Sequence, residues 1–286
     1  MSELDDPLFV QYMQSDNVAM AIASDIAYKH ELNSLDNPAT ANVETQKLLN
    51  ERFTEPHFLV PEFSSNNAIT IKRPNNEYIM AVRGTRPTNV SDLAADTQIL
   101  LNESHNNRTT NVENLYKSFR AEQPNAKLTI TGHSLGSFVG HQIANKYDED
   151  FVGFSHPATP FGLLSDNLDY GTTAKHTIYL TKNLDVISSF NKYAKFTDNV
   201  ISLPQKQETQ KDLFGSHSIE NFLPTKKERL APRILKTKKG KNTFFSVEPE
   251  TVRLSAKSNA AMHDNCADNS SLERCAKKIN KTLVYK

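Results

Sequence analysis

LTITGHSLGSFVGH, from Leu128 to His141, is the stretch that decides the fold. Its first four residues are apolar or β-branched, as in a buried strand, whereas the apolar residues after Ser134 recur at helical spacing. The period changes across Gly132, Ser134 and Gly136. The pattern predicts a strand, a sharp turn and a helix in direct succession.

The G-x-S-x-G spacing in this setting is typical of a nucleophile elbow, where a serine occupies strained backbone with its hydroxyl exposed. Side chains at positions 132 and 136 are expected to collide with the neighbouring strand and helix. The helix after Ser134 would direct its partly positive N–H groups toward an oxyanion. A plain turn is the simpler interpretation, but the chain has only nine glycines and the strand-turn-helix context favours the elbow.

The composition is that of a protein able to bury a core, with 286 residues, 37% hydrophobic and 23% charged. This length suits one large α/β domain or a smaller one with an appendage. No apolar run approaches the roughly 20 residues of a membrane helix, and the acidic start lacks the features of a secretory signal. Cys266 and Cys275 form no C-x-x-C pair or zinc-like cluster. We therefore expect a cytoplasmic or otherwise intracellular protein.

The net charge of zero conceals an asymmetry. Residues 225–286 hold 15 basic and 6 acidic residues, a net charge of +9, which leaves −9 for residues 1–224. We expect a folded α/β domain over 1–224 and a basic C-terminal extension over 225–286. Its densest part, Lys226 to Lys241, could contact an anionic membrane or an acidic partner. Pairing with the chain's own acidic domain is the simpler expectation, and no specific nucleic acid is predicted.

Helical and strand patterns alternate along the rest of the chain. Helices are predicted over Ser15–His30, Val43–Phe53 and Asn111–Arg120, turns over Asn33–Asn42, a hairpin over Ala68–Val82 that turns at Pro74–Asn76, and buried strands over Phe151–Phe154 and Thr177–Thr181. This alternation predicts a mostly parallel central sheet with helices on both faces. Sites in such sheets lie at the carboxyl ends of the strands.

Arg83-Gly84-Thr85 directly follows the second strand of the hairpin. At that place Thr85 could offer its N–H and its hydroxyl to an oxyanion, while Gly84 lets the backbone come close. A strand followed by an ordinary turn accounts for these residues equally well. Residues 86–101 follow as a loop that enters a short helix, where a flap over a site could be built.

A serine hydroxyl needs a histidine to take its proton and usually a carboxylate to orient that histidine. The α/β-hydrolase order is serine, acid, histidine, and Asp185 and His217 follow Ser134 in that order. No metal-ligand spacing and no glycine-rich phosphate loop occurs, so no metal or cofactor is expected. The alternatives for the acid and the base are Asp198 and Asp212, and His263, His156 and His176.

Six motifs stand in order between Ala19 and Leu223: AVRGT, SDLAAD, TGHSLG, FSHP, KNLDVI and SHSIENF. Together they resemble the class 3 lipases, the fungal triacylglycerol lipase family within the α/β-hydrolases. The resemblance implies an α/β-hydrolase fold. It also implies a triad and an oxyanion hole, with Ser134 as nucleophile, Asp185 as acid, His217 as base, and Thr85 and the N–H of Leu135 as oxyanion donors.

The chain departs from the family at two points. Ser137 stands where the family usually has a second glycine, and as a small residue it should still fit. The chain has no tryptophan and its stretch from Arg86 to Asp96 is polar, so strong interfacial activation is not expected. We expect a hydrolase of carboxylic esters, foremost of lipids as in a triacylglycerol lipase or phospholipase. The alternative is a catalytically silent lipase-like scaffold that binds partners through its basic segment.

Overall fold

The computed structural model describes residues 6–85, 105–157, 173–182, 199–210, 215–225, 234–236 and 242–244. The chain divides into two units, Met1–Pro224 and Thr225–Lys286. In the second unit the short strands β8 (Ile234–Lys236) and β9 (Asn242–Phe244) pair antiparallel. These two strands lie in the basic C-terminal extension, where the sequence pattern did not predict them. Both cysteines lie outside the described residues.

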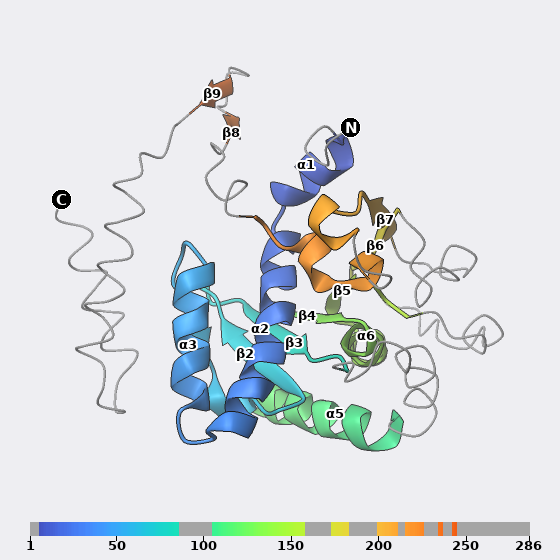
Figure 1. Ribbon diagram of the computed structural model, residues 1–286. Helices are drawn as coiled ribbons and strands as arrows, with labels where there is room; N and C mark the ends of the chain where they lie inside the picture. Colours follow the sequence, from blue (N-terminus) through green and yellow to red (C-terminus); the bar gives the residue numbers. More distant parts are fainter. Residues whose placement is uncertain are drawn as a thin grey trace. The chain divides into compact units, whose positions relative to one another are not determined.

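The described strands of the first unit form a seven-stranded sheet in which they follow one another in chain order (Figure 1). The antiparallel part comprises β1 (Phe58–Leu59), β2 (Ala68–Lys72) and β3 (Tyr78–Val82). The strands β4 (Leu128–His133), β5 (Asp150–Phe154), β6 (His176–Thr181) and β7 (Asn199–Leu203) then run parallel to β3. The prediction of a mostly parallel sheet is confirmed.

Helices cover both faces of this sheet, as predicted (Figure 1). One face carries α1 (Pro7–Met13), α2 (Asn17–Asp36) and α3 (Ala41–Arg52), and the other carries α5 (His105–Glu122) and α6 (Leu135–Tyr147). Short 3-10 turns complete the described part, namely η2 (Pro61–Phe63), η5 (Gln207–Thr209), η6 (Gly215–His217) and η7 (Ile219–Phe222). The first unit is therefore a three-layer α/β domain.

Alternate residues of each strand enter two separate cores. In β3, Ile79 and Ala81 join the core under α2, whereas Met80 and Val82 join the core under α5 and α6. This alternation is the period of two expected of a strand. Burial of each large apolar side chain contributes about 1.5–3 kcal/mol, so both layers hold the sheet and fix the ends of its strands.

Two helices are longer than predicted. α2 ends at Asp36 rather than His30, although turns were predicted over Asn33–Asn42, and α5 begins at His105 rather than Asn111. The added residues of α2 are half-buried or exposed, and local hydrogen bonds hold them: Ser34 Oγ donates to the His30 carbonyl at 2.8 Å, and the Asn37 N–H donates to the Asn33 carbonyl at 2.8 Å. The hairpin is confirmed, and Asn76 takes the expected left-handed conformation at its turn, with φ 60°.

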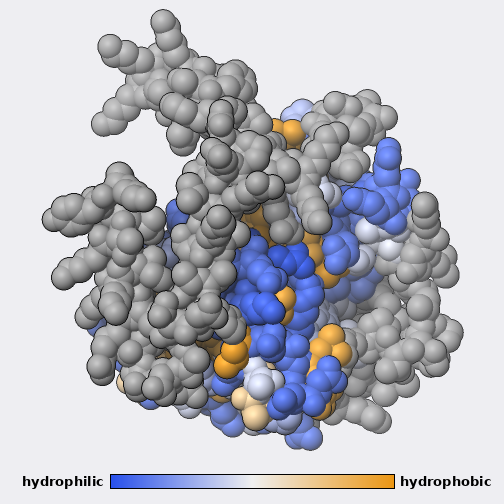
Figure 2. All heavy atoms as spheres, turned by 60° about the vertical axis from the view of Figure 1, so that its left-hand side comes forward, coloured by the Kyte–Doolittle hydropathy of each residue, from blue (hydrophilic) through white to orange (hydrophobic). Residues whose placement is uncertain are grey.

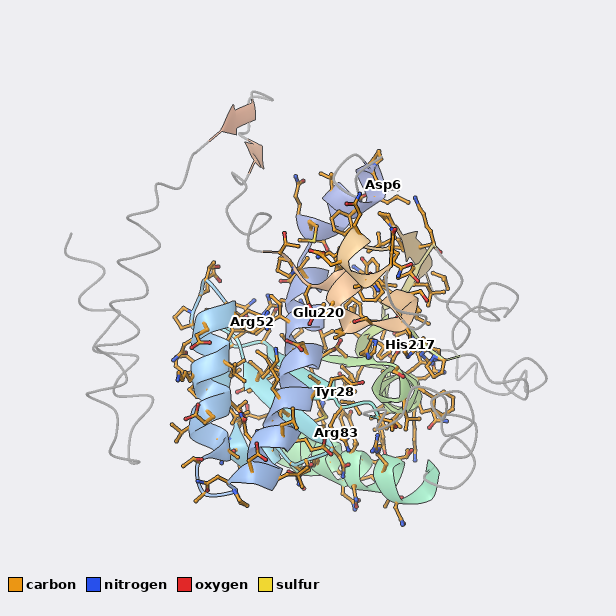
Figure 3. The ribbon with its side chains drawn as sticks, in the orientation of Figure 1. Asp6, Tyr28, Arg52, Arg83, His217 and Glu220 are labelled. Atoms are coloured by element: carbon orange, nitrogen blue, oxygen red, sulfur yellow. The ribbon has the colours of Figure 1, made fainter. Side chains whose placement is uncertain are left out.

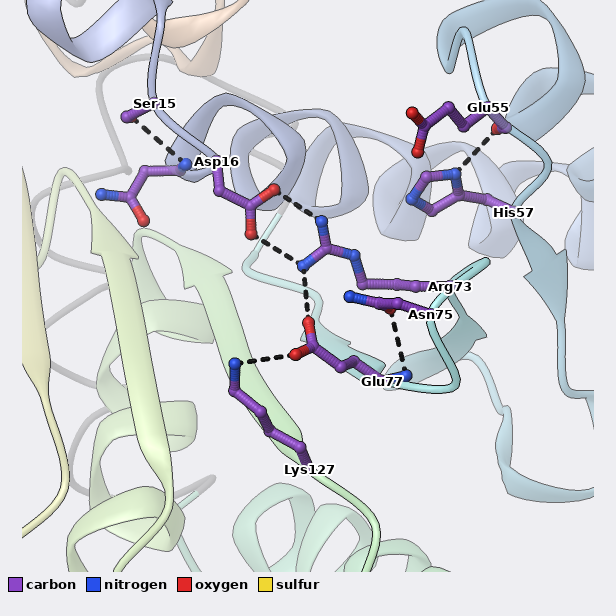
Figure 4. Close-up of polar contacts among 9 residues, drawn as sticks. Ser15, Asp16, Glu55, His57, Arg73, Asn75, Glu77 and Lys127 are labelled. Atoms are coloured by element: carbon purple, nitrogen blue, oxygen red, sulfur yellow. Dashed lines mark hydrogen bonds and ion pairs between the residues drawn. The ribbon is translucent and has the colours of Figure 1, made fainter. Parts of the chain in front are cut away.

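Ion pairs join α2, the hairpin and β4 at the amino ends of the strands (Figure 4). Arg73 makes a bidentate pair with Asp16, at 2.5 and 2.7 Å. Glu77 lies 3.4 Å from Arg73 and 2.8 Å from Lys127. Surface pairs of this kind contribute about 1 kcal/mol or less each. These pairs therefore lie at the opposite end of the parallel strands from the carboxyl ends, where a site is expected.

The coloured surface in Figure 2 is mostly hydrophilic, with small separate hydrophobic groups. The large hydrophobic side chains that are exposed among the described residues are Leu8, Val10, Leu32, Leu35, Val43 and Val200. Among the same residues, no helix combines the length and the apolar character needed to cross a bilayer.

A carboxylate ties α5 to α6. Glu113 Oε1 accepts hydrogen bonds from Lys117 Nζ at 2.8 Å, Tyr147 Oη at 2.5 Å and Lys146 Nζ at 3.0 Å. These hydrogen bonds, that from Lys117 foremost, lower the pKa of Glu113 to about 2 from its ordinary value of 4.5. The charged form of this side chain therefore stabilises the fold.

We predict that Glu113→Gln lowers the free energy of unfolding at neutral pH by about 1 kcal/mol, less than the full shift implies because solvent screens these charges. The carboxyl has a lower pKa in the folded than in the unfolded chain. Its stabilisation is thus present above about pH 4.5 and is lost as the pH falls toward about 2. Urea unfolding from neutral pH to about pH 3 should show the two proteins converge. A difference that stays constant over this range would contradict the account.

Candidate active site

Ser134 lies between β4 and α6 with an unusual backbone conformation, φ 55° and ψ −130°. A positive φ is strained for a residue with a side chain. The Ser134 N–H donates to the Phe154 carbonyl on β5 at 3.0 Å, and its carbonyl accepts from the Ser137 N–H at 2.9 Å. The sheet and the helix thus hold the strained residue from both sides, which is the backbone geometry of the predicted elbow.

Three glycines allow the segments at this turn to meet. A Cβ on Gly132 would lie 2.4 Å from the backbone of Gly136, and one on Gly136 would lie 2.2 Å from the Val82 carbonyl oxygen. A Cβ on Gly84 would lie 2.5 Å from the His133 carbonyl oxygen. All three distances are too short for real contacts, which confirms the expected need for glycine. The end of β3, the elbow and the start of α6 are therefore in direct backbone contact.

His217 lies beside Ser134. Its Nε2 is 2.8 Å from Ser134 Oγ, and the two residues are only 5% and 3% exposed. A heavy-atom distance of this size suits transfer of the hydroxyl proton to the imidazole. The structure thus brings together two of the three predicted triad positions, which are 83 residues apart in the sequence.

Side chains from three different elements hold η6, the turn that carries His217. Each of three successive carbonyl oxygens accepts a hydrogen bond from a side chain: Gly215 from Asn221 Nδ2 at 2.6 Å, Ser216 from Thr181 Oγ1 at 2.9 Å, and His217 from His133 Nε2 at 2.6 Å. The donors come from η7, β6 and β4. Because the last donor directly precedes Ser134, the His217 turn is tied to the elbow itself.

The two predicted oxyanion donors lie just beyond the carboxyl ends of the neighbouring strands β3 and β4. Thr85 follows β3, and its hydroxyl is buried with no hydrogen-bond partner in the described part of the chain. Leu135 is the first residue of α6, so its N–H has no acceptor within the helix. A buried hydroxyl without a partner costs free energy, and a hydrogen bond to an oxygen atom of a ligand would remove that cost.

Arg83 fixes the loop that carries Thr85. Its side chain is buried, donates from Nη1 to the Gly84 carbonyl at 2.6 Å and from Nε to the Asn66 carbonyl at 2.8 Å, and pairs with Glu31 at 3.2 Å. The C=O and N–H of a trans peptide point in opposite directions. With the Gly84 carbonyl held toward Arg83, the Thr85 N–H points away from it.

No protein-family model matches the chain, and no curated protein matches its sequence. Among solved structures, the Rhizomucor miehei lipase propeptide complex is 11% identical, with 77% of this chain and 81% of that chain covered and a TM-score of 0.40. The Lip2 lipase of Yarrowia lipolytica is 14% identical, with 61% and 76% covered and a TM-score of 0.35. Lipase II of Rhizopus niveus is 11% identical, with 59% and 72% covered and a TM-score of 0.31.

The remaining candidates have different outcomes. His156 Nδ1 lies 2.9 Å from Ser137 Oγ, and His176 Nε2 donates to the Glu149 carbonyl at 3.1 Å at the amino end of β6. Neither contact involves Ser134. Four candidates lie outside the described residues, namely Asp185, Asp198, Asp212 and His263. Most of the basic stretch from Lys226 to Lys241 also lies outside them.

Ser137 fits its place because of two neighbours. Gly153 on β5 leaves room for its side chain, since a Cβ there would lie 2.3 Å from Ser137 Oγ. The Ser137 hydroxyl in turn bonds to His156. The prediction that a small residue fits here is confirmed, and the hydroxyl has a partner.

Four residues around the site were not predicted to belong to it, namely Tyr28, Arg83, Arg108 and His133; Figure 3 labels Tyr28 and Arg83 together with His217. Tyr28 on α2 bonds through its hydroxyl to His133 Nδ1 at 3.0 Å, and burial raises the pKa of Tyr28 above its ordinary value. Arg108 on α5 donates to the Arg83 carbonyl at 3.4 Å, and burial, followed by the nearby charge of Arg83, lowers the pKa of Arg108 to about 10. In the sequence, the only signal for these roles was the presence of Arg83 and His133 inside the two motifs.

We predict that Gly136→Ala lowers the free energy of unfolding by about 1–3 kcal/mol, because the new methyl group meets backbone that cannot move away. Gly140→Ala in the same helix is the control. Its Cβ would first meet the Ile130 side chain at 3.2 Å, which can shift, and alanine favours the helix. Denaturant unfolding of both variants measures the difference, and equal stability would contradict the close contact at Gly136.

Proposed function

We propose that this protein is a serine hydrolase that cleaves carboxylic esters through an acyl-enzyme on Ser134. The observation that carries the proposal is the 2.8 Å distance between Ser134 Oγ and His217 Nε2 at a positive-φ turn between a strand and a helix. Serine is a weak nucleophile unless a neighbouring base takes its proton. A buried serine in strained backbone beside an imidazole has the arrangement that this chemistry needs.

In the proposed mechanism His217 is the general base. Its Nε2 takes the Ser134 proton as Oγ attacks the ester carbonyl carbon, and negative charge develops on the carbonyl oxygen. The imidazolium then returns the proton to the alkoxy oxygen as the bond between this oxygen and the carbonyl carbon breaks, which releases the alcohol and leaves the acyl group on Ser134. Water, activated by the same imidazole, hydrolyses the acyl group from Ser134 and restores the free hydroxyl.

Thr85 and Leu135 are the proposed oxyanion donors. The Leu135 N–H at the helix start and the Thr85 N–H and hydroxyl would stabilise the charge on the tetrahedral oxygen. Support comes from the buried, unpartnered Thr85 hydroxyl and from the Arg83 hydrogen bond that orients the Gly84–Thr85 peptide. Donors fixed before the reaction need no reorganisation when charge develops.

Asp185 is the proposed triad acid, on the basis of its place between Ser134 and His217 in the chain. It would orient the His217 ring and stabilise the imidazolium. The proposed substrates are lipid esters, as the resemblance to class 3 lipases implies. A peripheral contact of the basic segment with an anionic membrane or an acidic partner is compatible with such a substrate.

We predict that a fluorophosphonate probe labels the folded wild-type protein and that Ser134→Ala abolishes labelling, since the loss of a working nucleophile can cost on the order of 10⁶ in turnover. His217→Ala should slow labelling strongly because the hydroxyl loses its base. His263→Ala is the control and should react at the wild-type rate. Loss of labelling in His263→Ala rather than His217→Ala would overturn the assignment of the base. A folded wild type that is not labelled would favour a catalytically silent scaffold.

Thr85→Val should separate the oxyanion role of the hydroxyl from any structural one. Valine has nearly the same shape, so we predict a decrease in kcat of about 10²–10³ for ester hydrolysis. Stability should stay the same or rise, because a buried hydroxyl without a partner is removed. Thr85→Ser keeps the hydroxyl and should retain most of kcat. Full activity in Thr85→Val would contradict the role of the hydroxyl.

A further inference from the structure

We propose that His133 is a positioning residue, held by Tyr28, that fixes the backbone of His217 and so keeps the base beside Ser134. This inference rests on the proposed function. His133 ends β4, directly precedes Ser134 and is 7% exposed. Its Nε2 lies 2.6 Å from the His217 carbonyl oxygen and its Nδ1 lies 3.0 Å from Tyr28 Oη. The side chain therefore bridges α2 and the turn that carries the proposed base.

The partners determine where the hydrogens lie. A carbonyl oxygen can only accept, so His133 Nε2 carries the hydrogen in the bond to His217. In a neutral imidazole Nδ1 is then the acceptor, and the Tyr28 hydroxyl donates to it. A tyrosine hydroxyl is protonated at neutral pH, and burial raises the pKa of Tyr28 further. The tyrosine thus selects the tautomer of His133 that can hold the His217 carbonyl.

Gly84, in the loop that carries Thr85, leaves space for the Tyr28 hydroxyl. A Cβ on Gly84 would lie 2.1 Å from Tyr28 Oη. Glycine at this position therefore admits both the close backbone approach at His133 and the tyrosine hydroxyl. The Tyr28–His133 pair and the loop that carries Thr85 are packed as one block.

The contacts close a ring around the proposed nucleophile and base. Ser134 is covalently joined to His133, His133 bonds to the His217 carbonyl, and the His217 side chain returns to Ser134 Oγ at 2.8 Å. Asn221 and Thr181 hold the two preceding carbonyls of the turn, whereas His133 holds that of His217 itself. Loss of this bond frees the residue whose side chain must stay within proton-transfer distance. A shift of about 1 Å at such a group can cost on the order of 10² in rate.

The test compares His133→Leu with His133→Gln in the full chain, using hydrolysis of a p-nitrophenyl ester and the rate of fluorophosphonate labelling. Leucine fills the space without a donor, whereas the glutamine amide can donate near the place of Nε2. We expect His133→Leu to lower kcat and the labelling rate by about 10², with KM within about twofold of wild type. We expect His133→Gln to recover most of both rates. A crystal structure of His133→Leu should show His217 Nε2 beyond hydrogen-bond distance of Ser134 Oγ.

Tyr28→Phe keeps the buried ring and removes only the hydroxyl. It therefore tests the hydrogen bond between Tyr28 and His133 if the His133 variants do not fold. We expect kcat to fall by about tenfold, a smaller loss than in His133→Leu because the bond to His217 remains possible. His30→Leu is a matched control, since His30 is another buried, hydrogen-bonded histidine on α2. It should lower stability and leave kcat unchanged.

Two outcomes would overturn the inference. Wild-type kcat and labelling rate in folded His133→Leu would show that His133 only fills space. Equal losses in His133→Leu and His133→Gln, in proportion to their loss of stability, would show the same. Failure of the proposed function is distinguished by the wild-type protein, which would then not be labelled at all.

Discussion

The backbone contact between the end of β3, the elbow and the start of α6 is the constraint on which the rest of the structure depends. Gly132 and Gly136 allow the helix to start directly against the strand, and Gly136 brings it to the Val82 carbonyl oxygen. This contact forces Ser134 into its positive-φ conformation. The two cores on either side of the sheet hold the strands in place, and this burial offsets the strain of a single residue.

Buried hydrogen bonds fix the two segments that flank Ser134, the loop of Thr85 and the turn of His217. Arg83 orients the peptide before Thr85, and the donors from η7, β6 and β4 fix the turn of His217. A buried polar network is rigid only when its members have partners. The Thr85 hydroxyl is one of several buried polar groups that have no hydrogen-bond partner among the described residues. Its place after β3, beside the elbow, is what supports the proposed oxyanion role.

Local patterns in the sequence were enough to predict the elbow, the hairpin and the parallel strands around them. The elbow depends on neighbouring glycines and on a change of period within Leu128 to His141. The edge strands β1 and β7 were missed: β1 has only two residues, and both strands are defined by their pairing with a neighbour. The extension of α2 from Glu31 to Asp36 was missed because none of its side chains is buried, so it shows no apolar face at helical spacing.

The site was only partly predictable for the same reason. Chain order proposed His217 but could not exclude His263, and it took the distance to Ser134 Oγ to show that His217 lies there. Tyr28 and His133 are 105 residues apart, and His133 and His217 are 84 apart. No periodic pattern encodes contacts at such separations. The motif TGHSLG contained His133, but nothing local linked it to a carbonyl on a distant turn.

The most direct test of an activated Ser134 is to treat the wild-type protein with diethyl p-nitrophenyl phosphate and map the adduct by tryptic mass spectrometry. An activated serine attacks phosphorus and releases p-nitrophenolate, leaving a stable diethyl phosphoryl ester. The account predicts a single such group per chain, on the peptide that contains Ser134, with an equal amount of p-nitrophenolate released. A folded protein that releases none, or that carries the group on another residue, would contradict it.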